Sequence, residues 1–170
     1  MLTNGFRDDL REFARYYQTR DAWLASQEAV HPKRWRGKRS IESLVGPKML
    51  EYLPEEIGRA DIFGEFKDGD PLRGLLWTMA WGYNGTGNGP GRFNHQLGTY
   101  SPEKVATHVK RLTQLAASGQ LASAYEAMTG PFKIPGLGVS MGTKLLYFAG
   151  FEANIRSSSF GPIIADEMVF

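Results

Sequence analysis

Helical periodicity is the feature that most constrains the fold of this chain. Two stripes of apolar side chains follow Ser101 at helical spacing: Val105, Val109, Leu112 and Leu115, then Leu121, Ala124, Tyr125 and Met128. Residues so spaced lie on one face of an amphipathic helix. Ser101 and Pro102 suit the start of the first helix, and Gly119 suits its end. No segment alternates apolar and polar residues as a half-buried strand would, so the sequence predicts a mainly α fold.

Further helices are expected on the same grounds: Asp8–Ala25, Ser40–Leu44, Lys48–Tyr52, Leu72–Gly82 and Thr143–Phe151. The segment Leu72–Gly82 is apolar almost all round, which predicts a helix buried on most faces. The segment His31–Ser40 contains Pro32 and Gly37 and is predicted to be a loop, and the glycine-rich Gly82–Gly91 is predicted to be a mobile connection. A chain of 170 residues fits a single helical domain over residues 1–170.

Composition excludes several kinds of chemistry. The chain has no cysteine, so disulfides, thiol catalysis, cysteine-bound zinc and iron–sulfur clusters are excluded. The three histidines are scattered, and no other spacing reads as a metal motif, so we expect no metal and no cofactor. No apolar run is long enough to cross a bilayer, and the first residues do not resemble a signal peptide. We therefore expect a cytoplasmic monomer with no membrane partner.

Positive charge is local rather than general. The net charge is only +2, but between His31 and Lys48 there are six basic residues and one acid, Glu42. Arg34 and Arg36 are predicted to contact DNA phosphates, and Trp35 could stack on a base. A solvated basic loop is the alternative interpretation.

The run from Lys133 to Ala149 carries the strongest functional signal. A Pro-Gly-Leu-Gly turn at residues 135–138 joins two predicted helices. Such a turn, together with a helix N-terminus, can aim backbone N–H groups at a phosphate without reading a base. We expect DNA contacts from Lys133 and from Gly136, Gly138, Gly142 and Thr143. A tight connection with no ligand is the alternative.

Here the sequence resembles the helix-hairpin-helix DNA glycosylases, and within them the 8-oxoguanine DNA glycosylase branch. Gly142-Thr143-Lys144 opens an apolar helix, a Gly/Pro loop follows at residues 160–164, and Asp166 comes 22 residues after the lysine. The likeness is clearest over about residues 119–170. In the family the glycine turn and the Thr-Lys pair are usually continuous, whereas here residues 139–141 separate them. Either residues 135–138 or residues 139–142 form the hairpin.

The resemblance implies a DNA glycosylase that flips a damaged or modified base out of double-stranded DNA. Lys144 would attack the sugar and form a Schiff base, which allows lyase activity. Attack requires the neutral amine, so the pKa of Lys144 must be lowered. Apolar neighbours, here Leu145, Leu146 and Phe148, and a position at the start of a helix would both lower it. Asp166 would stabilise the positive charge that builds on the sugar.

The glycine-rich segment and the aromatic residues could contribute further contacts to DNA and to the base. Asn84 and Arg92 are predicted to contact DNA from the glycine-rich segment, where a side chain could fill the gap left by a flipped base. The aromatic residues are expected mainly in the core, with one or two able to wall a base pocket: Trp77, Trp81, Phe148 and Phe160. Three alternatives stay open: a non-catalytic DNA-binding module, a glycosylase without lyase activity that acts on modified phage DNA in antiviral defence, and a helical protein–protein module.

Overall fold

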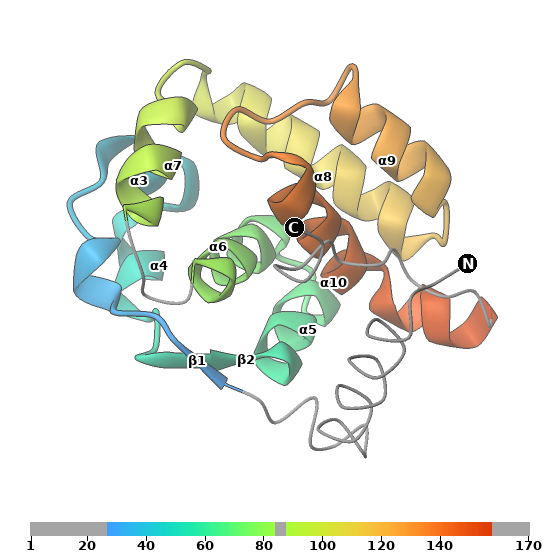
Figure 1. The fold of residues 1–170 in the computed structure, drawn as a ribbon, viewed down its shortest axis with the longest axis horizontal. Helices are drawn as coiled ribbons and strands as arrows, with labels where there is room; N and C mark the ends of the chain where they lie inside the picture. The colour runs from blue at the N-terminus through green and yellow to red at the C-terminus, as the bar shows by residue number, and fades with distance from the viewer. Residues whose placement is uncertain (1–26, 84–87, 158–170) are drawn as a thin grey trace, which may run out of the picture.

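The computed structural model describes residues 27–83 and 88–157, with the backbone alone for residues 27 and 152–157. The elements in this part of the chain are β1 (Gln27–Ala29), a 3-10 turn (Pro32–Arg34), α3 (Arg39–Val45), α4 (Pro47–Glu51), β2 (Glu56–Gly58), α5 (Arg59–Lys67), α6 (Pro71–Gly82), α7 (Gly89–Leu97), α8 (Pro102–Ala117), α9 (Leu121–Thr129) and α10 (Val139–Ser157). The prediction of a mainly α fold is confirmed (Figure 1).

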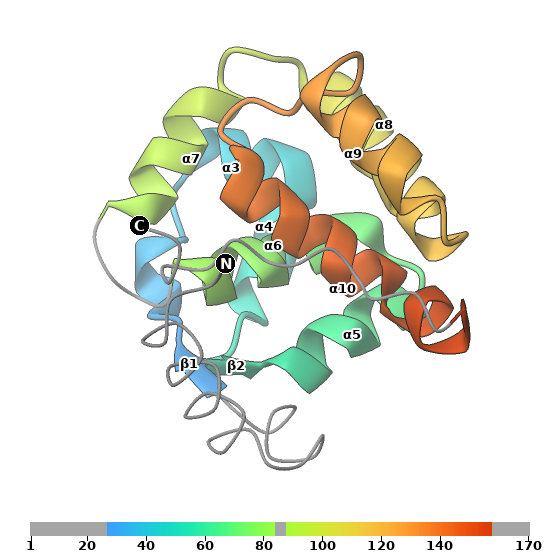
Figure 2. The ribbon, with the colours of Figure 1, turned by 45° about the vertical axis from the view of Figure 1, so that its right-hand side comes forward.

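Helix α6 forms the centre of the domain. All residues from Gly74 to Trp81 are buried, as the apolar sequence predicts. Helices α5, α8 and α10 pack against α6, and α10 also packs against α8 and α9 (Figures 1 and 2). The helix that carries Lys144 is therefore fixed on several sides by the core.

Local sequence signals explain where the main helices begin. The Asp70 carboxylate accepts hydrogen bonds from the N–H groups of Leu72 and Arg73, at 3.0 and 3.1 Å. The Ser101 hydroxyl accepts from the Lys104 N–H at 3.2 Å. Each cap is followed by a proline, whose missing N–H would have no partner in a first helical turn. The start predicted at Ser101 is confirmed.

Several predicted elements need correction. A short antiparallel ribbon pairs Gln27 with Gly58 and Ala29 with Glu56, although no strand was expected. Helix α5 was not predicted, and Gly89-Pro90-Gly91 open helix α7 instead of continuing a loop. Helix α10 begins at Val139, four residues before the predicted start, and the Gly142 N–H donates to the Gly138 carbonyl at 2.8 Å across its first turn. The helix expected at Asp8–Ala25 lies outside the described residues.

None of the helices within residues 27–83 and 88–157 could span a membrane. Within the same residues, no cluster of three or more histidine, aspartate or glutamate side chains could hold a metal ion.

Candidate functional site

The turn between α9 and α10 has a defined local structure. The Leu137 N–H donates to the Ile134 carbonyl at 3.1 Å, and Gly136 has a φ of +82°. Proline at the second position and a glycine of positive φ at the third are typical of a type II turn. Residues 134–137 therefore form a tight turn between α9 and α10, and residues 139–142 are the first turn of α10.

This turn presents backbone and charge at the surface. Ile134 and Leu137 are buried and anchor it, whereas Lys133, Gly138 and Val139 are exposed. The first N–H groups of a helix have no partner within the helix, and they point away from its N-terminal end. The α9–α10 turn can therefore bind an anion with N–H groups next to the Lys133 side chain.

Gly142 and Thr143 are placed differently from the rest of the predicted turn residues. Both are buried. A Cβ on Gly142 would collide with the Met128 side chain, so the glycine allows α9 and α10 to approach closely. The Thr143 hydroxyl donates to the Ser140 carbonyl at 3.0 Å, which holds it within its own helix.

Lys144 lies in the second turn of α10, and not at the helix start as predicted. Its side chain is only 7% exposed, and its Nζ lies 5.3 Å from the centre of the Trp81 ring. Helix α10 approaches the end of α6 closely at this point. A Cβ on Gly82 would collide with the Met141 side chain and would lie 3.7 Å from Lys144 Cδ. The amine is thus held against an aromatic face at the junction of α6 and α10.

Further groups surround the same indole. The Arg59 guanidinium, from the first residue of α5, lies 4.9 Å from the Trp81 ring centre. Phe148 meets the ring edge to face at 5.4 Å. Burial raises the pKa of Tyr147 to about 12, although the nearby Arg59 acts to lower it. The phenol of Tyr147 therefore keeps its proton at neutral pH and can donate a hydrogen bond.

The Trp81 indole also carries an unused donor. Its Nε1 is buried and has no hydrogen-bond partner among the described residues, and Trp81 is 5% exposed. A buried donor without an acceptor is costly, and such groups in folded proteins call for an explanation. A bound acceptor, such as a carbonyl oxygen of a base, would remove the cost.

Of the remaining residues predicted to contact DNA, those that the structure describes are not part of the cluster around Trp81. Arg34, Arg36 and Arg92 are exposed, and Arg36 donates from Nη2 to the Glu51 carbonyl at 3.4 Å. Trp35 is 1% exposed and belongs to the core next to Tyr83, so the idea that it stacks on a base is wrong. Asn84 and Asp166 lie outside the described residues.

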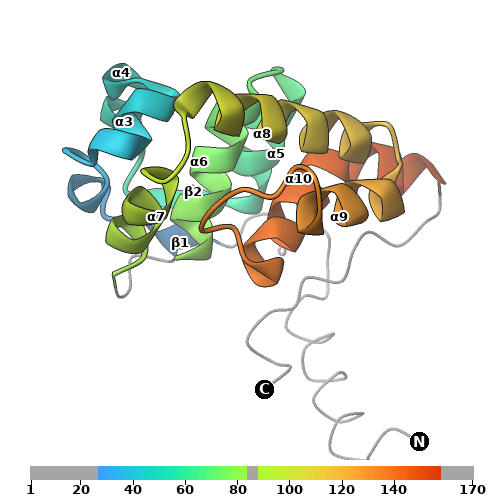
Figure 3. The same ribbon diagram turned by 90° about the horizontal axis from the view of Figure 1, so that it is seen from above.

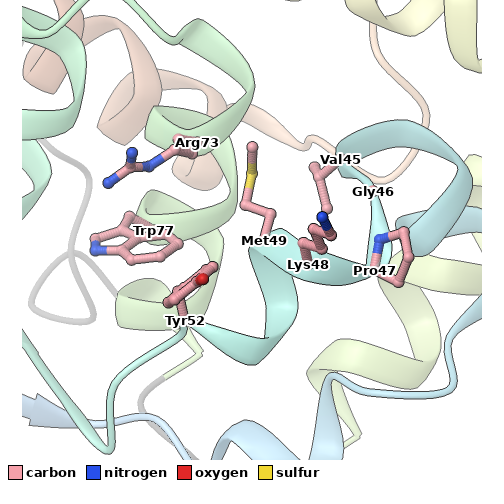
Figure 4. A pocket seen from close by; sticks show the side chains of 8 residues that line it. All are labelled: Val45, Gly46, Pro47, Lys48, Met49, Tyr52, Arg73 and Trp77. Carbon is pink, nitrogen blue, oxygen red and sulfur yellow. The ribbon is translucent and has the colours of Figure 1, made fainter.

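A sizeable cavity lies away from these residues. It measures about 720 Å³ and is lined by Val45, Gly46, Pro47, Lys48, Met49, Tyr52, Arg73 and Trp77 (Figure 4). Seen from above, α4 lies on one side of the domain and the start of α10 on the other (Figure 3). Among the described residues predicted for the site, Trp77, a candidate for the wall of a base pocket, lines this cavity, whereas Lys144 and Trp81 do not.

Residues 21–170 match the family described as "Putative 8-oxoguanine DNA glycosylase OGG-like protein". The chain belongs to this family. The match confirms the resemblance seen in the sequence, and the family implies a DNA substrate. No curated protein and no solved structure matches the chain.

Sequence reasoning missed two residues of the candidate site, Arg59 and Tyr147. Arg59 comes close to Trp81 only in the folded chain. Tyr147 likewise comes close to Arg59 only in the folded chain. Arg59 follows a short strand that had no sequence signal, and Tyr147 is one of several aromatic residues in an apolar helix. Trp81 and Phe148, in contrast, were candidates for the wall of a base pocket, and they do meet beside Lys144.

Proposed function

We propose that this protein is a DNA glycosylase that flips out a damaged or modified base and removes it with Lys144 as the nucleophile. The observation that carries the proposal is the burial of the Lys144 amine against Trp81, six residues after the exposed Gly138 of the α9–α10 turn. A phosphate held at the turn brings the neighbouring nucleotide within reach of the second turn of α10. Membership of the OGG-like family supports the same assignment.

The chemical step conserves atoms and charge. The Lys144 nitrogen forms a bond to the anomeric carbon, and the bond from that carbon to the base breaks. The base leaves with the bonding electron pair and takes up a proton. Opening of the sugar ring gives a Schiff base, from which the 3′ phosphate can be eliminated. Asp166 is assigned the role of stabilising the positive charge on the sugar.

The preferred substrate is 8-oxoguanine, because the family description names it. Oxidation gives this base an additional carbonyl oxygen. The Trp81 N–H and the protonated Tyr147 hydroxyl are donors suited to carbonyl oxygens. A modified cytosine from phage DNA is the alternative substrate, and it belongs in the same assay.

Borohydride trapping tests the nucleophile. Wild-type protein is incubated with duplexes that carry either 8-oxoguanine or a modified cytosine, and both the released base and the covalent adduct are measured. Lys144→Met removes the amine while keeping most of the side-chain length, and Lys110→Met, on the exposed surface of α8, is the matched control. We expect adduct formation with wild type and the control, and none with Lys144→Met.

Other outcomes separate the alternatives. Release of base without an adduct, undiminished in Lys144→Met, would show a glycosylase that uses water as the nucleophile. Binding of duplex with no release of any base would show a non-catalytic DNA-binding module. Loss of release in Asp166→Asn, with duplex affinity retained, is the expected result for the carboxylate.

A further inference from the structure

Helix α7 lies between α3 and the α9–α10 turn. The Asn94 side chain accepts a hydrogen bond from the Ser40 N–H at 2.9 Å, which joins α7 to the start of α3. On the other side, a Cβ on Gly136 would lie 3.1 Å from Gln96 Cβ, so Gln96 packs directly on the turn. Figures 1 and 2 show α7 beside both segments. The surface of α7 therefore continues the surface of the turn.

The two faces of α7 differ in character. Phe93 and Leu97 are buried in the core. Arg92, His95 and Gln96 are exposed, and their spacing of three and four residues places them on one face. Arg92 thus belongs to a fixed helical surface rather than to a pliable loop.

The charge pattern of the chain identifies the partner. Residues 71–102, which include α7, contain no aspartate or glutamate, and neither do residues 127–151, which include the turn and Lys144. Two segments without acids are therefore packed together, with Arg92 and Lys133 exposed on them. A surface that carries only positive or neutral groups attracts a polyanion without local repulsion.

We propose that the exposed face of α7, formed by Arg92, His95 and Gln96, binds the sugar–phosphate backbone of the DNA held by the α9–α10 turn. The proposal rests on the proposed function only in taking the turn to hold DNA. Gln96, which lies against Gly136, extends the row of donors from the turn onto the helix. Arg92, one turn earlier, supplies the positive charge. Contacts of this kind fix the position of the duplex and do not read its sequence.

Charge substitutions at Gln96 test the surface directly. Affinity for an undamaged duplex is measured by fluorescence anisotropy for Gln96→Glu and Gln96→Lys. Gln114→Glu and Gln114→Lys, on the exposed side of α8, are matched controls. We expect Gln96→Glu to weaken binding about tenfold and Gln96→Lys to strengthen it, with changes below about twofold at Gln114. Equal effects at the two positions, or none at Gln96, would overturn the proposal.

Two further measurements do not depend on those variants. Arg92→Gln should lower the salt dependence of binding by about one released ion, whereas Lys48→Gln, beside the distant cavity of Figure 4, should not. In wild-type protein, duplex should slow hydrogen exchange at the amides of residues 88–97. An unchanged salt slope for Arg92→Gln, unchanged exchange, or a wild type that binds no duplex would each count against the α7 surface. If the binding results follow the prediction but no base is released, the proposal for the α7 surface is supported and only the proposed function is contradicted.

Discussion

His108 on α8 and Lys133 in the α9–α10 turn are 25 positions apart, and the His108 Nδ1 lies 3.0 Å from the Lys133 carbonyl oxygen. A carbonyl oxygen can only accept, so this ring nitrogen carries the proton and donates. The His108 ring is 8% exposed and meets Phe132 edge to face, with ring centres 5.3 Å apart. The turn is therefore tied to the core through the Lys133 carbonyl.

Replacing His108 should loosen the turn. In His108→Phe the aromatic contact remains, but the Lys133 carbonyl loses its donor. A typical hydrogen bond contributes about 0.5–1.5 kcal/mol, and this one is partly buried, so the free energy of unfolding should fall by about that amount. Hydrogen exchange at residues 134–138 should become faster, and duplex affinity should fall while the rate of base release at saturating DNA is kept.

His108→Asn is the matched control, because its amide can donate close to the position of Nδ1. It should recover most of the stability and the slow exchange. If His108→Asn and His108→Phe behave alike, the hydrogen bond to Lys133 does not hold the turn.

Gly142 should be sensitive to substitution for a packing reason. A Cβ at this position would collide with the Met128 side chain, so Gly142→Ala forces α9 and α10 apart. Overpacking of this kind costs about 1–3 kcal/mol, measured as the change in free energy of unfolding by urea. Retention of full stability in Gly142→Ala would show that Met128 moves aside without cost.

Gly138 should respond in the opposite way. In the part of the chain that the structure describes, a Cβ on Gly138 would have no neighbour within 4 Å, and Gly138 is not among the glycines of positive φ. Gly138→Ala should therefore unfold at the wild-type temperature. Its duplex affinity should fall several-fold, because the methyl group stands where the backbone would meet a phosphate. Wild-type affinity in Gly138→Ala would contradict close approach of DNA at this residue.

Much of the fold followed from the sequence, because periodicity and caps act locally. The apolar pattern of α6, the Ser101 cap and the end of α8 near Gly119 depend on neighbouring residues, and the structure agrees with these predictions. The strand pair depends on Gln27 meeting Gly58 across the chain, which no local pattern records. Helix α7 was not predicted, because its first residues include Gly89 and Gly91, which are typical of loops. Phe93 and Leu97 form its buried face.

In the candidate site, too, the features set by local sequence were predicted, and those set by packing between distant segments were not. The turn was visible because Pro135-Gly136 has a characteristic local geometry. Lys144 was found through its order relative to Gly142 and Asp166, and its buried position beside Trp81 agrees with the need for apolar surroundings. Arg59 could not be found, because its place beside Trp81 results from the packing of α5 on α6.

Tyr147 gives a prediction on alkaline stability. Its pKa is raised to about 12 from the ordinary value of 10.0, mainly because the phenol is buried. Between these two values the folded chain keeps a proton that the unfolded chain has lost, so the folded state binds more protons and its stability falls as pH rises. This contribution is complete below pH 10 and declines from there to about pH 12. Urea unfolding at a series of alkaline pH values measures the effect.

Tyr147→Phe isolates this contribution from the other groups that titrate at high pH. The variant has no phenol to ionise, so its stability should decline less steeply above pH 10 than that of wild type, and phenolate absorbance should lose one late-titrating group. Since the ring contacts of Tyr147 with Phe63 and Phe148 remain possible in Phe, the core should be preserved. Parallel stability curves for the two proteins above pH 10 would show that the Tyr147 phenol titrates equally in the folded and unfolded chains.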